Sequence, residues 1–335
     1  MATIIPARKP IYNNQFADEF NWWVTVTYSK PIPSTSTMLI IKRSPTAGDS
    51  VNLRLNVSPL AKDYFRHSPN LTVPTAIQEP VLLEKVTVSL ANAGYGSGTF
   101  ATYDAYDGWE TYLSNVIGVS SMTVTKKLFR NSPAYISAKP FNTDNILWML
   151  NDGTNYTATN TQQATEKNLI FPVIHPSLTV TDAHTGLSVI GRDVSNNELW
   201  RLEYEFECPY DESNTIGFVN KYGVWEFIDI TGRKKTKLNT DRNSYTRYSD
   251  GVKQDYNVNG QYEYDFNTGW VERGFEDVME NLLLSEAVII YSGDGNDPIN
   301  ITIDTKSLDI QDSRANKMVN YNFKATVGKS IIPIT

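Results

Sequence analysis

The stretch Phe266-Asn267-Thr268-Gly269-Trp270-Val271, together with residues 272–286 that follow it, decides the fold class of the C-terminal part of this chain. Asn-Thr-Gly is a turn signal, and Trp270 is a residue type that cores favour. The residues after the turn carry apolar side chains at steps of three and four, which is the period of a helix with one buried face. These side chains are Val271, Phe275, Val278, Met279 and Leu282. The pattern predicts an amphipathic helix over 270–285.

The segments around this helix have the patterns of strands. In residues 199–207 Leu202, Tyr204 and Phe206 alternate with glutamates, which predicts a half-buried strand with an acidic outer face. Residues 216–220 and 224–230 predict a hairpin around the turn 220–223. Three closing strands are expected after the helix, at 287–291, 299–305 and 319–327. The C-terminal part is therefore expected to pack one helix on strands.

The first two thirds of the chain give a weaker version of the same pattern. Alternating segments at 22–28, 37–42 and 51–57 predict strands, and Ser58-Pro59 predicts the start of a short helix through residue 65. Residues 151–168 are rich in Asn, Thr and Gln and are expected to form an exposed loop. The expected class is mainly β, with β-sandwich or barrel-like domains, few short helices and minor α+β character. The expected divisions are 1–68, 69–190 and 191–335.

Composition narrows the classes of function. The chain has 335 residues, a formal net charge of −7, one cysteine and three histidines. A single cysteine excludes an intrachain disulfide, and this Cys and His content argues against a zinc site. The acidic balance argues against nucleic acid as the main partner. With no signal-peptide pattern and no apolar run of about 18 residues, we expect a protein made in a cytoplasm that stays soluble or joins an assembly.

Two acidic clusters could carry chemistry. Asp104, Asp107 and Glu110 lie among aromatic residues and could serve a glycosidase, in which two carboxylates flank the scissile bond. The rings there could instead stack on a sugar without catalysis; these are Tyr103, Tyr106 and Trp109. A Tyr- and Asp-rich turn explains the same residues. Asp294, Asn296 and Asp297 resemble the start of a calcium loop, but a β-turn explains them and the later ligands are missing. We expect no enzyme, no cofactor and no metal.

Two oppositely charged segments suggest an interaction surface. Residues 231–253 carry a formal charge of about +5 and include Arg233, Lys234, Lys235 and Lys237. Residues 198–212 carry about −5, and include Glu203, Glu205 and Glu207. Complementary patches on one subunit could meet between neighbouring copies in a ring. The alternatives are a solvated hairpin and contact with DNA.

Three blocks resemble a known family. They are the stretch from Val57 to Phe65, then Cys208-Pro209-Tyr210 followed by 218–223, and finally 267–272 with 282–286, 305–307 and 316–321. Their order and spacing are similar to virion proteins of tailed phages that infect Bacteroidetes, including crAss-like phages. The resemblance is best over about 195–327, is weaker over 20–66 and does not extend to 80–190. It implies a β-rich tail, neck or baseplate component that assembles with copies of itself or with other virion proteins, and it carries over no active residues.

Three functions follow as expectations, in decreasing order of support. The first is a structural tail or baseplate protein, a ring or adaptor located in the tail or neck of the virion. The second is a receptor-binding or fibre-attachment module that recognises a host glycan through Tyr103, Tyr106 and Trp109. The third is a polysaccharide depolymerase.

Overall fold

The computed structural model describes most of the C-terminal two thirds of the chain and isolated strands before it. The described residues are 3–6, 12–16, 22–31, 34–43, 52–56, 78–82, 86–92, 99–106, 125–138, 145–159, 167–207, 214–221, 225–291, 298–307 and 318–327. Within them, side chains are described from residue 125 onward, except at 137–138, 167–170 and 257. Strands dominate, and the expectation of a mainly β fold is confirmed.

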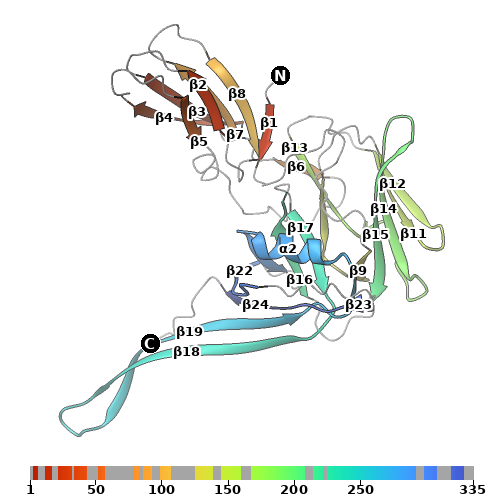
Figure 1. The fold of residues 1–335 in the computed structure, drawn as a ribbon. Coiled ribbons are helices and arrows are strands. Elements are labelled where there is room, and N and C mark those ends of the chain that lie inside the picture. The colour runs from red at the N-terminus through yellow and green to blue at the C-terminus, as the bar shows by residue number, and fades with distance from the viewer. Residues whose placement is uncertain are drawn as a thin grey trace.

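The N-terminal strands form one five-stranded sheet and one two-stranded sheet (Figure 1). The larger sheet has the order β1-β8-β7-β3-β4, and β2 pairs with β5 in the smaller one. These strands confirm the expected ones near 22–28, 37–42 and 51–57. Their bounds are β1 Thr3–Pro6, β2 Tyr12–Phe16, β3 Trp22–Pro31, β4 Ser34–Arg43, β5 Asn52–Asn56, β7 Val86–Asn92 and β8 Thr99–Tyr106. The expected helix at 58–65 lies outside the described residues.

A second five-stranded sheet has the order β12-β11-β14-β15-β9, and a three-stranded sheet has the order β10-β13-β6. In the larger of the two, β9 runs parallel to β15 and the other neighbours are antiparallel. The strands are β6 Gln78–Leu82, β9 Lys126–Phe129, β10 Tyr135–Ala138, β11 Asn145–Leu150, β12 Asn155–Thr159, β13 Lys167–Pro172, β14 Gly186–Arg192 and β15 Glu198–Glu207.

The C-terminal strands form a seven-stranded sheet with the order β17-β16-β21-β22-β24-β19-β18. The predicted hairpin around 220–223 is confirmed, because β16 pairs with β17 in antiparallel register. The strands are β16 Asn214–Val219, β17 Trp225–Ile230, β18 Lys234–Thr246, β19 Lys253–Asn267, β21 Val288–Tyr291, β22 Ile299–Ile303 and β24 Asn322–Val327, and a separate short pair joins β20 Val271–Glu272 to β23 Met318–Val319.

The strands β16, β17 and β21 are buried along their whole length because both of their faces are covered. Successive side chains point to opposite faces of a strand, so each strand supplies two cores. Phe218 and Ile290 face a cluster that includes the helix, whereas Phe227 and Ile289 face a cluster that includes the second five-stranded sheet. β17 therefore carries apolar side chains on both of its faces, interrupted by two acidic residues that are also buried.

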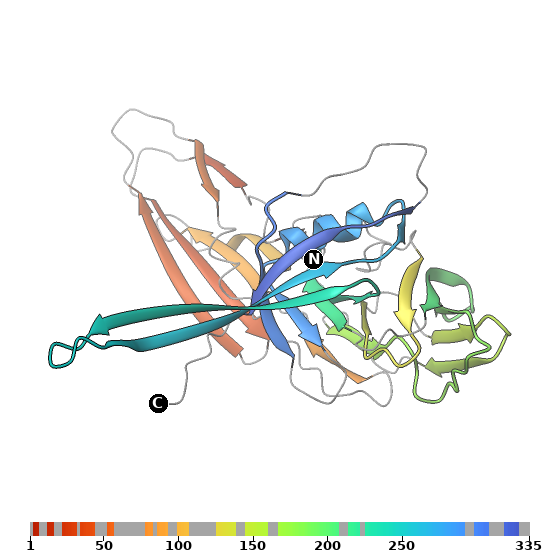
Figure 2. The same ribbon diagram turned by 90° about the horizontal axis from the view of Figure 1, so that it is seen from below.

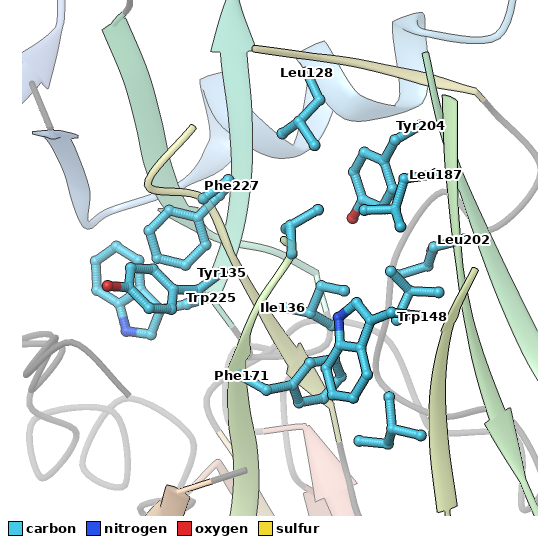
Figure 3. Packing of buried hydrophobic residues seen from close by; sticks show 14 of the residues in the cluster. Leu128, Tyr135, Ile136, Trp148, Phe171, Leu187, Leu202, Tyr204, Trp225 and Phe227 are labelled. Carbon is cyan, nitrogen blue, oxygen red and sulfur yellow. The ribbon is translucent and has the colours of Figure 1, made fainter. Parts of the chain in front are cut away.

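The cluster between the sheets is built around aromatic rings (Figure 3). Trp148 on β11 is fully buried and meets Phe171 edge-on, with ring centroids 5.6 Å apart. Its indole Nε1–H donates to the carbonyl of Pro172 at 3.2 Å. Tyr135 packs edge-on against Phe227 at 5.7 Å and so links β10 to β17. These contacts hold the three-stranded sheet between the two larger ones.

The helix α2, Glu276–Leu284, covers the other face of the seven-stranded sheet. Phe275, Val278, Met279 and Leu282 are buried in one cluster, as their spacing predicts. The helix begins six residues later than expected, because Val271 pairs with Val319 as part of β20. The expectation that Trp270 lies in the core is wrong, since its side chain is 60% exposed.

Buried polar groups join β9 to β17. Lys126 Nζ lies 2.6 Å from a carboxylate oxygen of Glu226, and both side chains are almost completely buried. Three residues along, Asp229 accepts hydrogen bonds from the Phe129 backbone N–H at 2.9 Å and the Thr215 hydroxyl at 2.6 Å. Burial raises the pKa of Asp229 above its ordinary value. A strand of one sheet is thus fixed to the edge of the other by side-chain bonds.

Two expectations from the sequence need correction. Residues 151–168 are not a single exposed loop, since they contain β12 and the start of β13. The sheets also cross the expected divisions at 68 and 190: β3 pairs with β7, and β14 itself spans residue 190 while pairing with β15. Strand pairing between distant segments sets these units, and local composition does not reveal it.

Candidate interaction site

The strands β18 and β19 form a long hairpin that projects from the seven-stranded sheet (Figures 1 and 2). They pair from Lys234 with Phe266 out to Thr246 with Lys253. Within the described residues only the base of β19 has a second neighbour, because its pairing with β24 ends at Glu263. We call residues 238–262 the arm. Both views show its outer half extending beyond the rest of the described chain.

The turn of the arm is built by local hydrogen bonds. Gly251 adopts a positive φ of 68°, which glycine tolerates without a Cβ clash. Its N–H donates to the Arg247 carbonyl at 2.9 Å, and the Asp250 carboxylate accepts the Val252 N–H at 3.2 Å. Further in, the register shifts between Asp241 and Asn243, which marks a β-bulge. The hairpin is therefore an ordered element rather than a loop.

The arm exposes apolar and aromatic side chains on a strand pair that has no core. Tyr245 and Tyr256 contact each other edge-on at 5.8 Å, yet each remains about half exposed. Tyr248 at the turn is fully exposed. The exposed large side chains of the arm are Leu238, Tyr245, Tyr248, Val252, Tyr256 and Tyr262. Tyrosines at such density are typical of protein interfaces.

The predicted basic residues lie at the base of β18 and are partly neutralised by β19. Lys234 Nζ donates to Asn214 Oδ1 at 2.7 Å and lies 4.9 Å from the centre of the Tyr264 ring. Lys237 pairs with Glu263 at 3.5 Å. Arg233 and Lys235 are exposed. Residues 233–267 contain seven basic and five acidic side chains, and the arm itself contains three of each. The charge of +5 expected for 231–253 is thus reduced by the strand that pairs with it.

The predicted acidic residues lie on β15, in the second five-stranded sheet. Glu203 accepts hydrogen bonds from the Ser188 hydroxyl at 2.7 Å and from Arg201 at 3.2 Å. Glu207 pairs with Lys127 of β9. Glu205 is exposed. No ion pair within the described residues joins these glutamates to the basic residues of β18. Their meeting between neighbouring copies stays a prediction.

The side chains of the predicted glycan-binding, acidic-cluster and calcium-loop residues are not among those that the structure describes. Tyr103, Asp104 and Tyr106 belong to β8, whose side chains are not described. The residues Asp107, Trp109, Glu110, Asp294, Asn296, Asp297 and Cys208 lie outside the described residues. Among the residues described with side chains, no group of three or more His, Cys, Asp or Glu could hold a metal ion.

His184, Asp152 and Thr181 are arranged like a catalytic triad, but their contacts stabilise turns. His184 Nε2 lies 3.1 Å from Asp152 Oδ2, and its Nδ1 lies 3.1 Å from the Thr181 hydroxyl. However, Nδ1 also accepts the Thr181 backbone N–H at 2.9 Å, so its single lone pair is already engaged. The ring therefore has no acceptor with which to take a proton from that hydroxyl. The contacts of His184 fix the turn 181–184 to the β11–β12 turn.

His175 gives a pH-dependent prediction. Its ring stacks on Tyr156 at 4.0 Å, and its Nδ1 accepts the Ser177 N–H at 3.1 Å. Burial lowers the pKa of His175 below the ordinary 6.5. The unfolded chain then takes up a proton at this residue more readily than the folded chain, so the folded state should lose stability as pH falls below about 6.5.

The measurement is the free energy of unfolding at about pH 7.5 and about pH 5.5, for the parent and for His175→Phe. The phenyl ring keeps the stacking but cannot titrate. The loss between the two pH values is expected to be smaller in the variant. Equal losses would show that His175 does not contribute.

No helix in the described residues is long and apolar enough to cross a membrane. Neither the protein-family models nor the curated proteins compared with this chain match it. A proposal of function therefore rests on the geometry of the molecule and on the resemblance of its three sequence blocks to virion proteins.

Proposed function

We propose that this chain is a non-enzymatic structural protein of a tailed-phage virion, a tail or baseplate ring or adaptor that assembles with copies of itself and with other tail or neck proteins. The observation that carries the proposal is the projecting arm. Its residues belong to neither core of the described chain, yet they form a regular strand pair with exposed tyrosines. The sequence resemblance supports the same class.

The energetics of the arm favour assembly. An isolated two-stranded hairpin is marginally stable in water, and each ordered residue costs about 1–2 kcal/mol of backbone entropy. Backbone pairing of β19 with β24 ends at Glu263, and the Gln261 side chain adds one hydrogen bond to the Val327 carbonyl at 3.0 Å; the arm extends beyond both. Side chains such as Tyr245 and Tyr256 gain substantial burial only when another surface covers them. A protein that functions alone has little use for such an element.

The partners fit a protein assembly better than DNA. Phosphate binding needs a concentration of basic side chains, and the arm carries equal numbers of basic and acidic residues. Its interacting partners are therefore expected to be proteins of the tail or neck, with fibre proteins among the candidates. The expected location is the tail or neck region of the virion.

Electron microscopy of intact particles tests the proposal. Gold particles bound to a peptide tag at the C-terminus of the chain should mark one fixed place on the tail or neck. An untagged particle is the control. Purified particles without this protein would overturn the proposed function.

Shortening the arm separates its role from that of the cores. Replacing residues 240–260, which begin and end at the paired Thr240 and Gly260, with Asn-Gly should leave the free energy of unfolding within about 1 kcal/mol of the parent, because the removed residues touch neither core. Incorporation into particles should fail. Normal incorporation of the shortened chain would show that the arm is not an assembly element.

A further inference from the structure

β18 is the last strand of the seven-stranded sheet, and one of its backbone edges is unpaired within the described residues. Proteins usually protect such an edge by shortening it, by placing proline or charged side chains in it, by a bulge or by covering it. β18 does carry charges, but they are of both signs, so they disfavour only those partner strands that oppose like charges. β18 is 13 residues long and contains no proline. Its long outer edge can accept another strand by ordinary ladder hydrogen bonds.

The sequence of β18 tests whether that strand can come from a second copy. In an antiparallel pair, residues directly opposite share the same hydrogen-bonding class. Residues of one class alternate along each strand, so two identical strands can oppose only residues that are an even number of positions apart. The two-fold axis that relates the two strands must therefore pass through a residue and not between two residues. An axis at Lys237, Asp241 or Arg242 sets like charges opposite each other, which is destabilising.

An axis at Asn239 gives a complementary register. Asp241 of each copy then lies opposite Lys237 of the other, so that two pairs of opposite charges form, and over residues 234–244 no like charges are opposed. Among the axes from Thr236 to Asn243 no other register has both properties. An axis at Leu238 also forms two pairs of opposite charges, but it places Lys234 opposite Arg242.

The same register makes use of exposed apolar surface. Leu238 is half exposed and lies directly across from Tyr262 within the hairpin. With the axis at Asn239, the Leu238 side chains of the two copies become diagonal neighbours on one face, a spacing that long side chains span. Lys237 can turn to the second copy without leaving Glu263 alone, because Lys324 lies 3.9 Å from that carboxylate.

We propose that β18 binds β18 of a second copy of this chain in antiparallel register, across a two-fold axis at Asn239. This inference rests on the proposed function, since it names the first partner of the arm. The resulting contact is isologous: each copy gives and receives the same edge. The two arms join as one four-stranded ribbon with the order β19-β18-β18-β19.

Charge reversal tests the register. In a dimer of Lys237→Glu, each introduced glutamate faces Asp241 of the other copy, so acidic groups are opposed twice. In a dimer of Asp241→Lys, each introduced lysine faces Lys237 of the other copy, so lysines are opposed twice. Each single variant should weaken the dimer of the full chain by about tenfold or more, as measured by analytical ultracentrifugation.

An equimolar mixture of the two variants should recover dimers. The glutamate introduced at position 237 of one copy then faces the lysine introduced at position 241 of the other, and the unchanged Asp241 and Lys237 face each other across the axis. Two misfolded proteins would not recover on mixing.

Lys253→Glu is the matched control, because it makes the same charge change on β19, away from the β18 edge. It should dimerise like the parent. A parent that stays monomeric, or a mixture that stays monomeric while the parent dimerises, would overturn the proposed pairing.

A cross-link locates the axis independently. In a chain with Cys208→Ser, Asn239→Cys should form an intermolecular disulfide on mild oxidation, because the two Cβ atoms would be about 4.5–5.5 Å apart. Arg242→Cys should not, since six strand positions, about 20 Å, would separate the two residues. An oligomer in which Asn239→Cys does not cross-link would overturn the register. The failures are distinguishable: a monomer found in the tail removes this inference alone, whereas a dimer absent from particles removes the proposed function.

Discussion

Glu226→Ala is expected to lower the free energy of unfolding of the full chain by about 3–5 kcal/mol, the usual loss when one partner of a buried ion pair is removed. Lys126 Nζ lies 2.6 Å from the carboxylate of Glu226, and its side chain is only 6% exposed. Without Glu226 the ammonium group would lose the carboxylate with which it pairs, in a site that is almost completely buried. Asn220 would lose an acceptor as well, at 3.2 Å. Chemical denaturation of the purified chain measures the effect.

Two controls give this result its meaning. The exposed pair of Arg201 with Glu198 has nearly the same length, 2.7 Å, so Glu198→Ala should cost less than about 1 kcal/mol. The double variant Lys126→Met with Glu226→Leu should cost less than Glu226→Ala alone, because it removes both charges. A loss below about 1 kcal/mol for Glu226→Ala would show that Lys126 finds water or another acceptor.

The sequence predicts best the elements whose pattern reports burial. β15 alternates because one of its faces is covered, and β17 has apolar side chains on both faces because both are covered. The predicted face of α2 is correct for the same reason. The apolar pattern of a segment reflects which of its side chains are buried. Strands and helices that pack against a core can therefore be predicted from the sequence.

The sequence indicates a hairpin at 231–253 only as one alternative and does not show the extent of its strands, because neither face of the arm is buried. Residues 231–253 lack apolar alternation and have the pattern of a polar excursion, although β18 is a strand of 13 residues. The strand is fixed by hydrogen bonds to β19, which leave no periodic mark in the sequence. β12 escapes prediction for the same reason, with three of its five residues exposed.

The sequence predicts only part of the candidate site. It identifies Lys234 and Lys237 as members of a basic segment, but Glu263, which pairs with Lys237, is 26 residues away and is invisible to a local count. The acidic face of β15 is similarly occupied by Arg201 and by Lys127 from a distant strand. Charges counted along a segment overestimate the charge of a surface whenever strand pairing brings in the opposite sign.

Phe275→Ala is expected to destabilise the C-terminal part by about 3–5 kcal/mol, because truncation of a buried ring removes its transfer free energy and leaves a cavity. Phe275 precedes α2, is 5% exposed and packs in the cluster that lies between the helix and the seven-stranded sheet. Its carbonyl accepts the Met279 N–H at 3.0 Å, a backbone bond that the alanine variant keeps, so the loss is expected to come from the ring. Chemical denaturation of the parent and the variant measures the loss.

Trp270→Ala is the matched control for this prediction, since it removes a larger ring five residues away that is 60% exposed. It should cost less than about 1 kcal/mol. Phe266 belongs to the same cluster as Phe275 and stacks on Phe323 at 5.1 Å, at the base of the arm. Loss of the Phe275 ring should therefore also increase hydrogen exchange of the backbone amides of β19 near Phe266, while the amides of β11 keep their protection. A loss below about 1 kcal/mol for Phe275→Ala, or equal losses for the two variants, would show that the helix does not hold the base of the arm.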